Sequence, residues 1–359
     1  MIGGVLSKAY PDNMTPPHFQ VVHEWEEEIA KRLGVPVRKI FVESNPAPSK
    51  FRITPKLMRL RHIIAGKVFL TFPLIRRMIC DRLRPPFTQD ISLPLSVCFL
   101  MSVHIKEVSM LSGNNCIPVF LDVWSDFNIE EVVRRTKGFR LFYVTSRDVY
   151  NRVKATSPQS NVHYMPLSVA DKYHSENFSA YRNKTIDVLH SSRKNPVLHE
   201  YMMQYADKHS GLDYVYKENG EYISTLRGNI GRCLSREDYM NLIASAKVCL
   251  VGCSGIDGSR ADTYGICFPT PRFYESAVLG CALIGRYPEN QEFRELNMSR
   301  YCPNITSYDQ FTHELERALS QTPEELYAQH RDFILGSLTS KRAEQIRHDL
   351  EELTCGQNS

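Results

Sequence analysis

Apolar residues in the first half of the chain follow two kinds of pattern. Residues 21–33 carry apolar side chains at helical spacing, which predicts an amphipathic helix that Gly34 ends. Residues 95–101, 117–123 and 139–144 are short and almost continuously apolar. Such runs, when they are separated by helical stretches, are typical of buried strands in a parallel sheet that is covered on both faces.

The same alternation starts again in the second half. It predicts strands at residues 185–189, 248–252 and 282–284, and helices at 196–208, 239–246 and 270–279. A polar, irregular stretch at 166–180 separates the two series. We therefore expect an α/β protein with two domains, and 359 residues are enough for each domain to build its own core.

Charge is distributed unevenly along the chain. The net charge is only +4, but residues 50–84 contain ten Lys or Arg and one Asp, mixed with apolar side chains. This composition suits a helix on an anionic membrane surface, and it also suits a solvated basic face that binds nothing in particular. Nucleic acid is not expected as a partner, because no aromatic platform or known motif accompanies the basic residues.

The cysteines and the apolar runs bear on the compartment. The ten cysteines include no Cys-x-x-Cys pair, and the N-terminus lacks the layout of a signal peptide. No run reaches the ~18 apolar residues of a spanning helix. We therefore expect reduced, mostly buried thiols in a cytoplasmic protein, with peripheral contact to the inner face of a membrane through residues 50–84.

A polar loop follows the first predicted strand of the second half. Ser191, Arg193 and Lys194 lie in it, and Pro196 then opens a helix. In parallel sheets, ligands bind beyond the carboxyl ends of the strands, and helix amino ends favour anions. Arginine and lysine at that place suit a phosphate, although an ordinary polar surface loop has the same composition.

The most informative stretch is TPRFYESAVLGCALIG, residues 270–285. Thr270 is placed to cap a helix that begins at Pro271. Arg272 lies in the first turn, where a cation opposes the helix dipole unless an anion is bound beside it. Glu275 lies one turn further on, where its carboxylate can accept hydrogen bonds from ribose hydroxyls. The alternative is a surface Arg272–Glu275 pair that contributes little.

This stretch, together with the following YPENQEFREL and the earlier IDVLHSSRKN, resembles the donor site of bacterial glycosyltransferases of the "group 1" type. The spore-coat and capsule branch is the most similar. The resemblance covers about residues 165–335, whereas the first half is similar only in its layout.

The resemblance implies a GT-B fold, in which two Rossmann-like domains face each other and a C-terminal helix crosses back to the first. The expected parts are an acceptor-side domain at 1–168, a nucleotide-sugar-binding domain at 169–335, and a C-terminal helix and tail at 336–359. It also implies that Glu275 binds the donor ribose and that Arg193 and Arg272 neutralise the diphosphate. The crossing helix would lie within residues 323–353.

Two further features concern the chemistry. Retaining members of the family often carry a second glutamate eight residues before the conserved one, and this chain has Cys267 there. The chain also contains no Asp-x-Asp pair, the usual metal-holding motif of the other large transferase architecture. We therefore expect no metal and no cofactor, with cations and helix amides meeting the charge of the leaving group.

The acceptor side is less determined. Asp122 ends a predicted strand and is a candidate base towards an acceptor hydroxyl, and His104 is a second candidate catalytic residue. An aspartate that caps a turn and a histidine packed in the core are the structural alternatives.

The leading hypothesis is a glycosyltransferase of the hexosyltransferase type. It would move a sugar from a UDP- or GDP-sugar to a cell-surface glycan or a lipid-linked acceptor. A nucleotide-sugar epimerase or hydrolase on the same fold is one alternative, and a non-catalytic glycan- or nucleotide-binding protein is another.

Overall fold

The computed structural model describes residues 2–9, 17–41, 94–100, 115–123, 129–175, 184–258, 263 and 265–355. The basic segment at 50–84 and His104 lie outside these residues, so the expectations placed on them stay predictions. No helix in the described part of the chain is both long and apolar enough to cross a membrane.

The first lobe is a six-stranded sheet in which every neighbouring pair is parallel, in the order β2-β1-β3-β4-β5-β6. Its strands are β1 (Ile2–Ala9), β2 (Val37–Phe41), β3 (Leu95–Leu100), β4 (Cys116–Phe120), β5 (Phe142–Val144) and β6 (Val162–Tyr164). The helices α1 (Pro17–Leu33), α5 (Ile129–Thr136) and α6 (Arg147–Thr156) belong to the same lobe. Every residue of β3, β4 and β5 is buried, as continuous apolar runs predict.

The second lobe has a six-stranded sheet in the order β10-β9-β8-β7-β11-β12. Strands β8, β7, β11 and β12 are parallel to one another, and β9 and β10 add an antiparallel hairpin at the edge. The bounds are β7 (Ile186–His190), β8 (Tyr214–Glu218), β9 (Glu221–Ser224), β10 (Gly228–Gly231), β11 (Ala246–Gly252) and β12 (Ala282–Arg286). The helices are α7 (Pro196–Ala206), α8 (Arg236–Ala244), α9 (Pro271–Val278), α10 (Gln291–Glu295), α11 (Met298–Tyr301), α12 (Tyr308–Ser320) and α13 (Pro323–Ser337).

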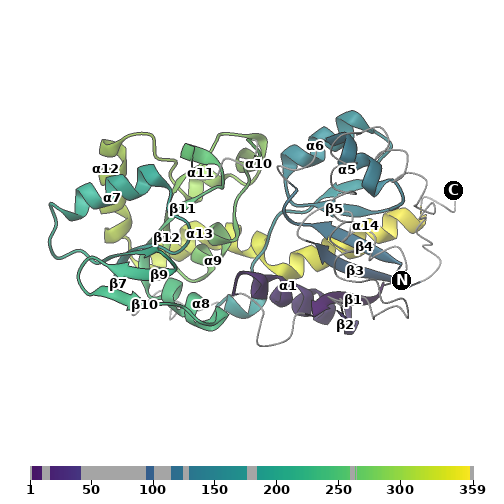
Figure 1. Cartoon of the computed structure of the whole chain (residues 1–359), viewed down its shortest axis with the longest axis horizontal. Coiled ribbons are helices and arrows are strands. Elements are labelled where there is room, and N and C mark those ends of the chain that lie inside the picture. The colour runs from purple at the N-terminus through teal and green to yellow at the C-terminus, as the bar shows by residue number, and fades with distance from the viewer. Residues whose placement is uncertain are drawn as a thin grey trace, which may run out of the picture.

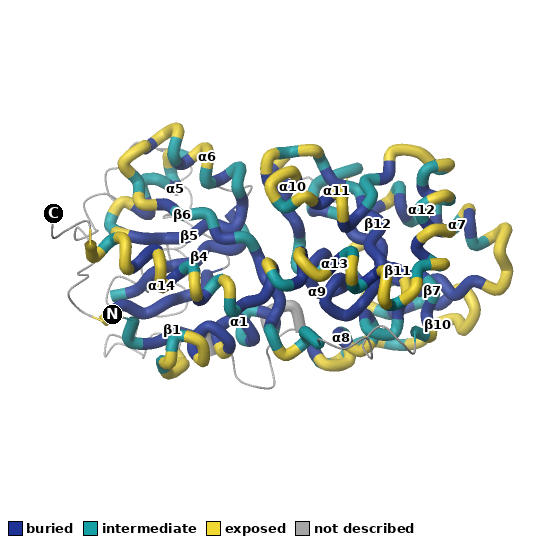
Figure 2. The backbone as a smooth tube through the Cα atoms, turned by 180° about the vertical axis from the view of Figure 1, so that it is seen from behind, coloured by how far each residue is buried: buried dark blue, intermediate teal, exposed yellow. Residues whose placement is uncertain are grey.

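The two lobes lie side by side, each with helices around its own sheet (Figure 1). Buried residues follow the strands of both sheets, and exposed residues follow the outer helices (Figure 2). The protein is therefore α/β with two facing parallel-dominated sheets, as the sequence predicts.

The C-terminal helix returns to the first lobe. After α13 in the second lobe, α14 (Thr339–Cys355) packs on α1, and the Tyr143 hydroxyl donates to Asp349 at 2.9 Å. The single helix expected at 323–353 is in fact two helices. The chain is extended at Leu338, where it pairs with Val169, and this pairing interrupts the helix.

Candidate functional site

The carboxyl ends of three adjacent parallel strands in the second lobe meet at one edge of the sheet. β11 lies between β7 and β12, and Gly252 is in register with Arg286. The helices α7 and α9 begin beside this edge, with Asn195 and Thr270 as their N-cap residues. The loops chosen from the sequence therefore converge on one place, where helix amides and strand ends are typical of ligand sites.

Asn195 organises the loop after β7. Its side-chain oxygen accepts from the Leu198 amide at 3.0 Å and its side-chain nitrogen donates to Asp257 at 2.8 Å. Its backbone amide donates to Nε2 of His190 at 3.2 Å. Burial, and then the neighbouring His199 and Lys194, lower the pKa of His190 to about 3. His190 is therefore neutral and holds the loop as an acceptor.

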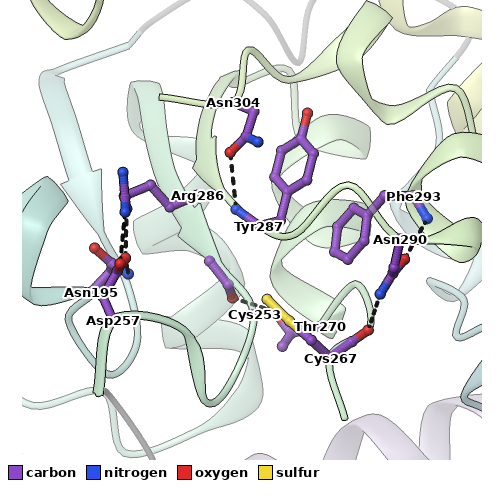
Figure 3. Close-up of a disulfide and its surroundings, with 11 residues drawn as sticks. Asn195, Cys253, Asp257, Cys267, Thr270, Arg286, Tyr287, Asn290, Phe293 and Asn304 are labelled. Carbon is purple, nitrogen blue, oxygen red and sulfur yellow. Dashed lines mark hydrogen bonds and ion pairs between the residues drawn. A yellow bond between two sulfur atoms is a disulfide. The ribbon is translucent and has the colours of Figure 1, made fainter. Parts of the chain in front are cut away.

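Asp257 and Arg286 form a paired bridge between the ends of β11 and β12. Arg286 Nε lies 2.5 Å from Oδ2 of Asp257 and Nη2 lies 2.6 Å from Oδ1, a fork geometry (Figure 3). The hydrogen bonds from Arg286 hold the pKa of the Asp257 carboxyl below its usual range. This pair fixes the loop that follows β11, and sequence analysis did not single out either residue.

Two cysteines in this region form a disulfide, which corrects the expectation that the thiols are reduced. Cys253 follows β11 and Cys267 precedes α9, and the chain brings their Cα atoms to 5.8 Å (Figure 3). The Cys267 carbonyl also accepts from the Asn290 side chain at 2.8 Å. The bond therefore ties the end of a strand to the segment that leads into α9.

Ser191 and Arg272 are linked through Tyr239, on α8. The Ser191 and Tyr239 hydroxyls lie 3.2 Å apart, and burial raises the pKa of Tyr239 to about 12. Burial opposes the charge of Arg272, but the adjacent Tyr239 and Glu275 outweigh this effect and raise its pKa. The Nε atom of Arg272 is buried and has no hydrogen-bond partner among the described residues. A buried guanidinium donor of this kind favours an anionic or strongly polar ligand.

Glu275 is almost fully buried, with 2% of its surface exposed. Its Oε1 atom lies 2.8 Å from Nη2 of Arg236, the first residue of α8. Nε of Arg236 lies 3.1 Å from Glu24 of α1, in the first lobe. Glu275 is therefore paired with Arg236, and the surface Arg272–Glu275 pair considered as an alternative does not describe this buried site.

The other predicted donor-site residues lie around the same edge. Arg193 is exposed in the loop after β7. Lys194 points towards β8, where Nζ lies 3.2 Å from Glu218 and 4.7 Å from the centre of the Tyr216 ring. Thr270 makes no side-chain cap bond, and its hydroxyl lies 3.5 Å from the Gly252 carbonyl.

Asp122 lies in the other lobe, two residues after β4 ends, and is partly exposed. It therefore stands at the carboxyl edge of the first sheet, as the sequence predicts.

A second contact between the lobes joins α10 to α6. Glu292, also 2% exposed, accepts from the Arg147 backbone amide at 2.9 Å and from the Tyr164 hydroxyl at 2.9 Å. Burial raises the pKa of Glu292 to about 7, and these hydrogen bonds oppose the rise only in part. The Arg147 side chain pairs with Glu295 at 2.6 Å.

A cavity of about 270 Å³ lies away from this region. It is lined by Ile2, Leu95 and residues of α14 such as Leu350. Ile2 and Leu95 begin their strands, so the cavity lies at the amino edge of the first sheet, where ligands of parallel sheets do not usually bind.

Comparison with known proteins gave matches among solved structures only: no family model and no curated protein matches the chain. The N-terminal domain of Candida albicans trehalose-6-phosphate phosphatase is 9% identical with a TM-score of 0.52, covering 98% of this chain and 96% of that one. Anabaena HepE, solved in complex with UDP, is 10% identical with a TM-score of 0.46, covering 98% and 100%. The UDP-forming trehalose-phosphate synthase of Burkholderia xenovorans is 10% identical with a TM-score of 0.46, covering 76% and 75%.

At such identities a likeness speaks for the fold alone. The Candida albicans match extends over nearly the whole of both chains, and this chain has two facing sheets of mainly parallel strands with a final helix that returns to the first lobe. The chain has the GT-B fold.

Proposed function

We propose that this protein is a glycosyltransferase that uses a nucleotide-sugar donor, held at the carboxyl edge of the second sheet. The observation that carries the proposal is the Nε atom of Arg272 at the start of α9, which is buried without a hydrogen-bond partner among the described residues, with Glu275 one turn away. A diphosphate would supply the missing acceptor, and a ribose would supply hydroxyls to a carboxylate.

The charges at this edge fit a bound diphosphate. Arg272 is partly exposed with its Nε atom buried, Arg193 is exposed in the adjoining loop, and the amino end of α9 adds its partial positive charge. Together these groups would stabilise the nucleoside diphosphate as it leaves, without a metal. UDP- and GDP-sugars are the donors that we propose, with hexose as the transferred sugar.

The acceptor would approach from the first lobe. Asp122 stands at the carboxyl edge of that lobe's sheet, in the place for a base that accepts a proton from an acceptor hydroxyl. We propose a cell-surface glycan as the acceptor, either lipid-linked or free, at the inner face of a membrane.

Thermal unfolding with UDP, GDP and their sugar conjugates tests the donor site. A true donor at a hundredfold excess over its dissociation constant stabilises the protein by about 2.7 kcal/mol and raises the unfolding midpoint. Because Arg193 is exposed, Arg193→Ala should fold normally and weaken donor binding roughly tenfold or more. Arg232→Ala is the matched control, since Arg232 is exposed and pairs with Glu221.

The outcomes separate the candidate functions. Turnover that depends on an added acceptor supports transfer. Interconversion or release of the sugar without an acceptor indicates an epimerase or a hydrolase, and binding without turnover indicates a binding protein. If no nucleotide shifts the midpoint of the wild type, the donor site is refuted.

A further inference from the structure

One guanidinium joins two buried carboxylates that belong to different lobes. Arg236 contacts Glu24 of α1 through Nε and Glu275 of α9 through Nη2. The exposed fractions of the three side chains are 10% for Arg236, 7% for Glu24 and 2% for Glu275. With so little water present, the orientation of each group is set by the other two.

The start of helix α8 is not a place where a helix by itself favours an arginine. A cation in the first turn of a helix opposes the helix dipole, and Ser235 and Asp238 already form a capping box there. Burial opposes the charge as well, but Glu275 and then Glu24 outweigh it and raise the pKa of Arg236. The two carboxylates are therefore what keeps the guanidinium in place.

Helix α1 also holds the backbone of Arg236. The Gln20 side-chain oxygen accepts from the Arg236 amide at 2.9 Å. Gln20 and Glu24 lie four residues apart, so they share one face of α1. The first turn of α8 is consequently fixed by the first lobe through both its backbone and its side chain.

Glu24 is in turn held by the segment that joins the lobes. Lys172 Nζ lies 2.9 Å from its Oε1 atom, and the Tyr173 hydroxyl donates to the same oxygen. The other oxygen, Oε2, faces Arg236. Each carboxylate oxygen of Glu24 therefore has its own partner, which leaves little freedom to the guanidinium.

We propose that Arg236 is a positioning residue that couples the donor-site carboxylate Glu275 to helix α1 of the first lobe. Glu24 orients the guanidinium, and the guanidinium orients Oε1 of Glu275, which then presents a fixed carboxylate to the donor ribose. This inference rests on the proposed function, because it assigns Glu275 to the donor.

The coupling has a thermodynamic consequence. If the contact between α1 and α8 strengthens donor binding, donor binding strengthens that contact by the same factor. A change at Glu24, a residue of the first lobe, should therefore weaken the binding of a donor to the second lobe.

The experiment compares two glutamates on the same helix. Glu24→Gln keeps the shape of the side chain and removes its charge. Glu28→Gln is the matched control, because Glu28 is one turn along α1 and pairs with Arg32, away from Arg236. Donor affinity is measured by calorimetry, and the donor KM and kcat are measured with an acceptor.

Glu24→Gln should raise the donor dissociation constant and KM about tenfold, with kcat within about twofold of the wild type. Glu28→Gln should leave all three unchanged. Arg236→Lys keeps a cation but loses the planar guanidinium that can contact two carboxylates. Its donor dissociation constant and KM should lie between those of Glu24→Gln and the wild type.

A purely structural role gives a different result. It would lower the fraction of folded enzyme, and so the apparent kcat, without changing the donor KM. That pattern, or a Glu24→Gln variant that binds donor as the wild type does, overturns the inference while the proposed function stands. A wild type that binds none of the nucleotide sugars overturns both.

Discussion

Two of the contacts between the described parts of the lobes each contain a buried glutamate, but the partners differ. Glu275 and Glu292 are both 2% exposed. Glu275 faces the guanidinium of Arg236, whereas Glu292 accepts from a backbone amide and a tyrosine hydroxyl. Among the described residues, the groups that donate to Glu292 are neutral, and burial raises the pKa of Glu292 to about 7.

The difference shows that burial alone does not decide what a buried carboxylate does. A nearby cation compensates for the lost hydration of the charged form, while neutral donors do so only in part. The guanidinium of Arg147 is close to Glu292, but it pairs with Glu295 and lies over the Tyr164 ring. The pKa of Arg236 is raised, so its guanidinium stays charged, whereas the contact at Glu292 is expected to respond to pH near neutrality.

The largest effect is expected from removing the cation of the ionic contact. Arg236→Met leaves Glu275 buried without the cation that it pairs with and removes one of the two cations at Glu24, so unfolding by urea should show a loss of about 3–5 kcal/mol. The triple variant Glu24→Gln, Arg236→Met, Glu275→Gln has no buried charge and should recover much of that loss. A single variant as stable as the wild type would show that the contact is not formed in solution.

The second effect concerns pH and the other contact. The pKa of Glu292 is raised from 4.5 to about 7, so the folded protein binds its proton more tightly than the unfolded chain does. The resulting stabilisation is fully present below about pH 4.5 and is lost as the pH rises through about 7, by about 3 kcal/mol. The free energy of unfolding, measured by urea at a series of pH values, should therefore depend less steeply on pH in Glu292→Gln than in the wild type.

Glu295→Gln is the control for that measurement. Glu295 is exposed and pairs with the side chain of the same arginine, Arg147. Replacing Glu295 should leave the pH dependence of the free energy of unfolding as it is in the wild type. If Glu292→Gln also keeps that pH dependence, Glu292 is not its cause.

The smallest of the three effects tests the disulfide, which lies within the second lobe. A Cys253→Ser, Cys267→Ser variant opens a loop with a sequence separation of 14 and should lose about 3 kcal/mol or less. Since neither cysteine belongs to a contact between the lobes, the pH-dependent component of stability should persist. An equal midpoint for oxidised and reduced wild type would show that the bond does not support the folded state.

Regular elements with a strong local pattern were predicted within a few residues. The strand expected at 248–252 is β11 (Ala246–Gly252), and the helix expected at 270–279 is α9 (Pro271–Val278). Strands β8, β9 and β10 were not predicted, because they are short and none of them is a continuous buried apolar run. The break at Leu338 was also missed, since its cause is pairing with Val169, far away in the sequence.

The residues of the candidate site also divide into those that the sequence indicated and those that only the structure revealed. Periodicity and helix-start signals were enough to bring Ser191, Thr270 and Arg272 to one edge of a sheet, because parallel strands put their carboxyl ends together. Tyr239 was expected only as the first residue of an ordinary helix at 239–246, and Arg236 lay outside that expected helix. The role of Arg236 depends on Glu24, which lies 212 residues away, and that of Tyr239 depends on Ser191, 48 residues away.

By itself, the sequence determined the α/β class, the doubled alternation of strands and helices, and the polar loops that follow the strands of the second half, because these follow from local spacing and composition. Only the tertiary structure decided which groups meet: Glu275 with Arg236, Cys253 with Cys267, and Glu292 with Tyr164. The reason is physical. The charge, hydrogen bonding and pKa of a buried group depend on neighbours within a few ångströms, and chain folding brings those neighbours from distant parts of the sequence.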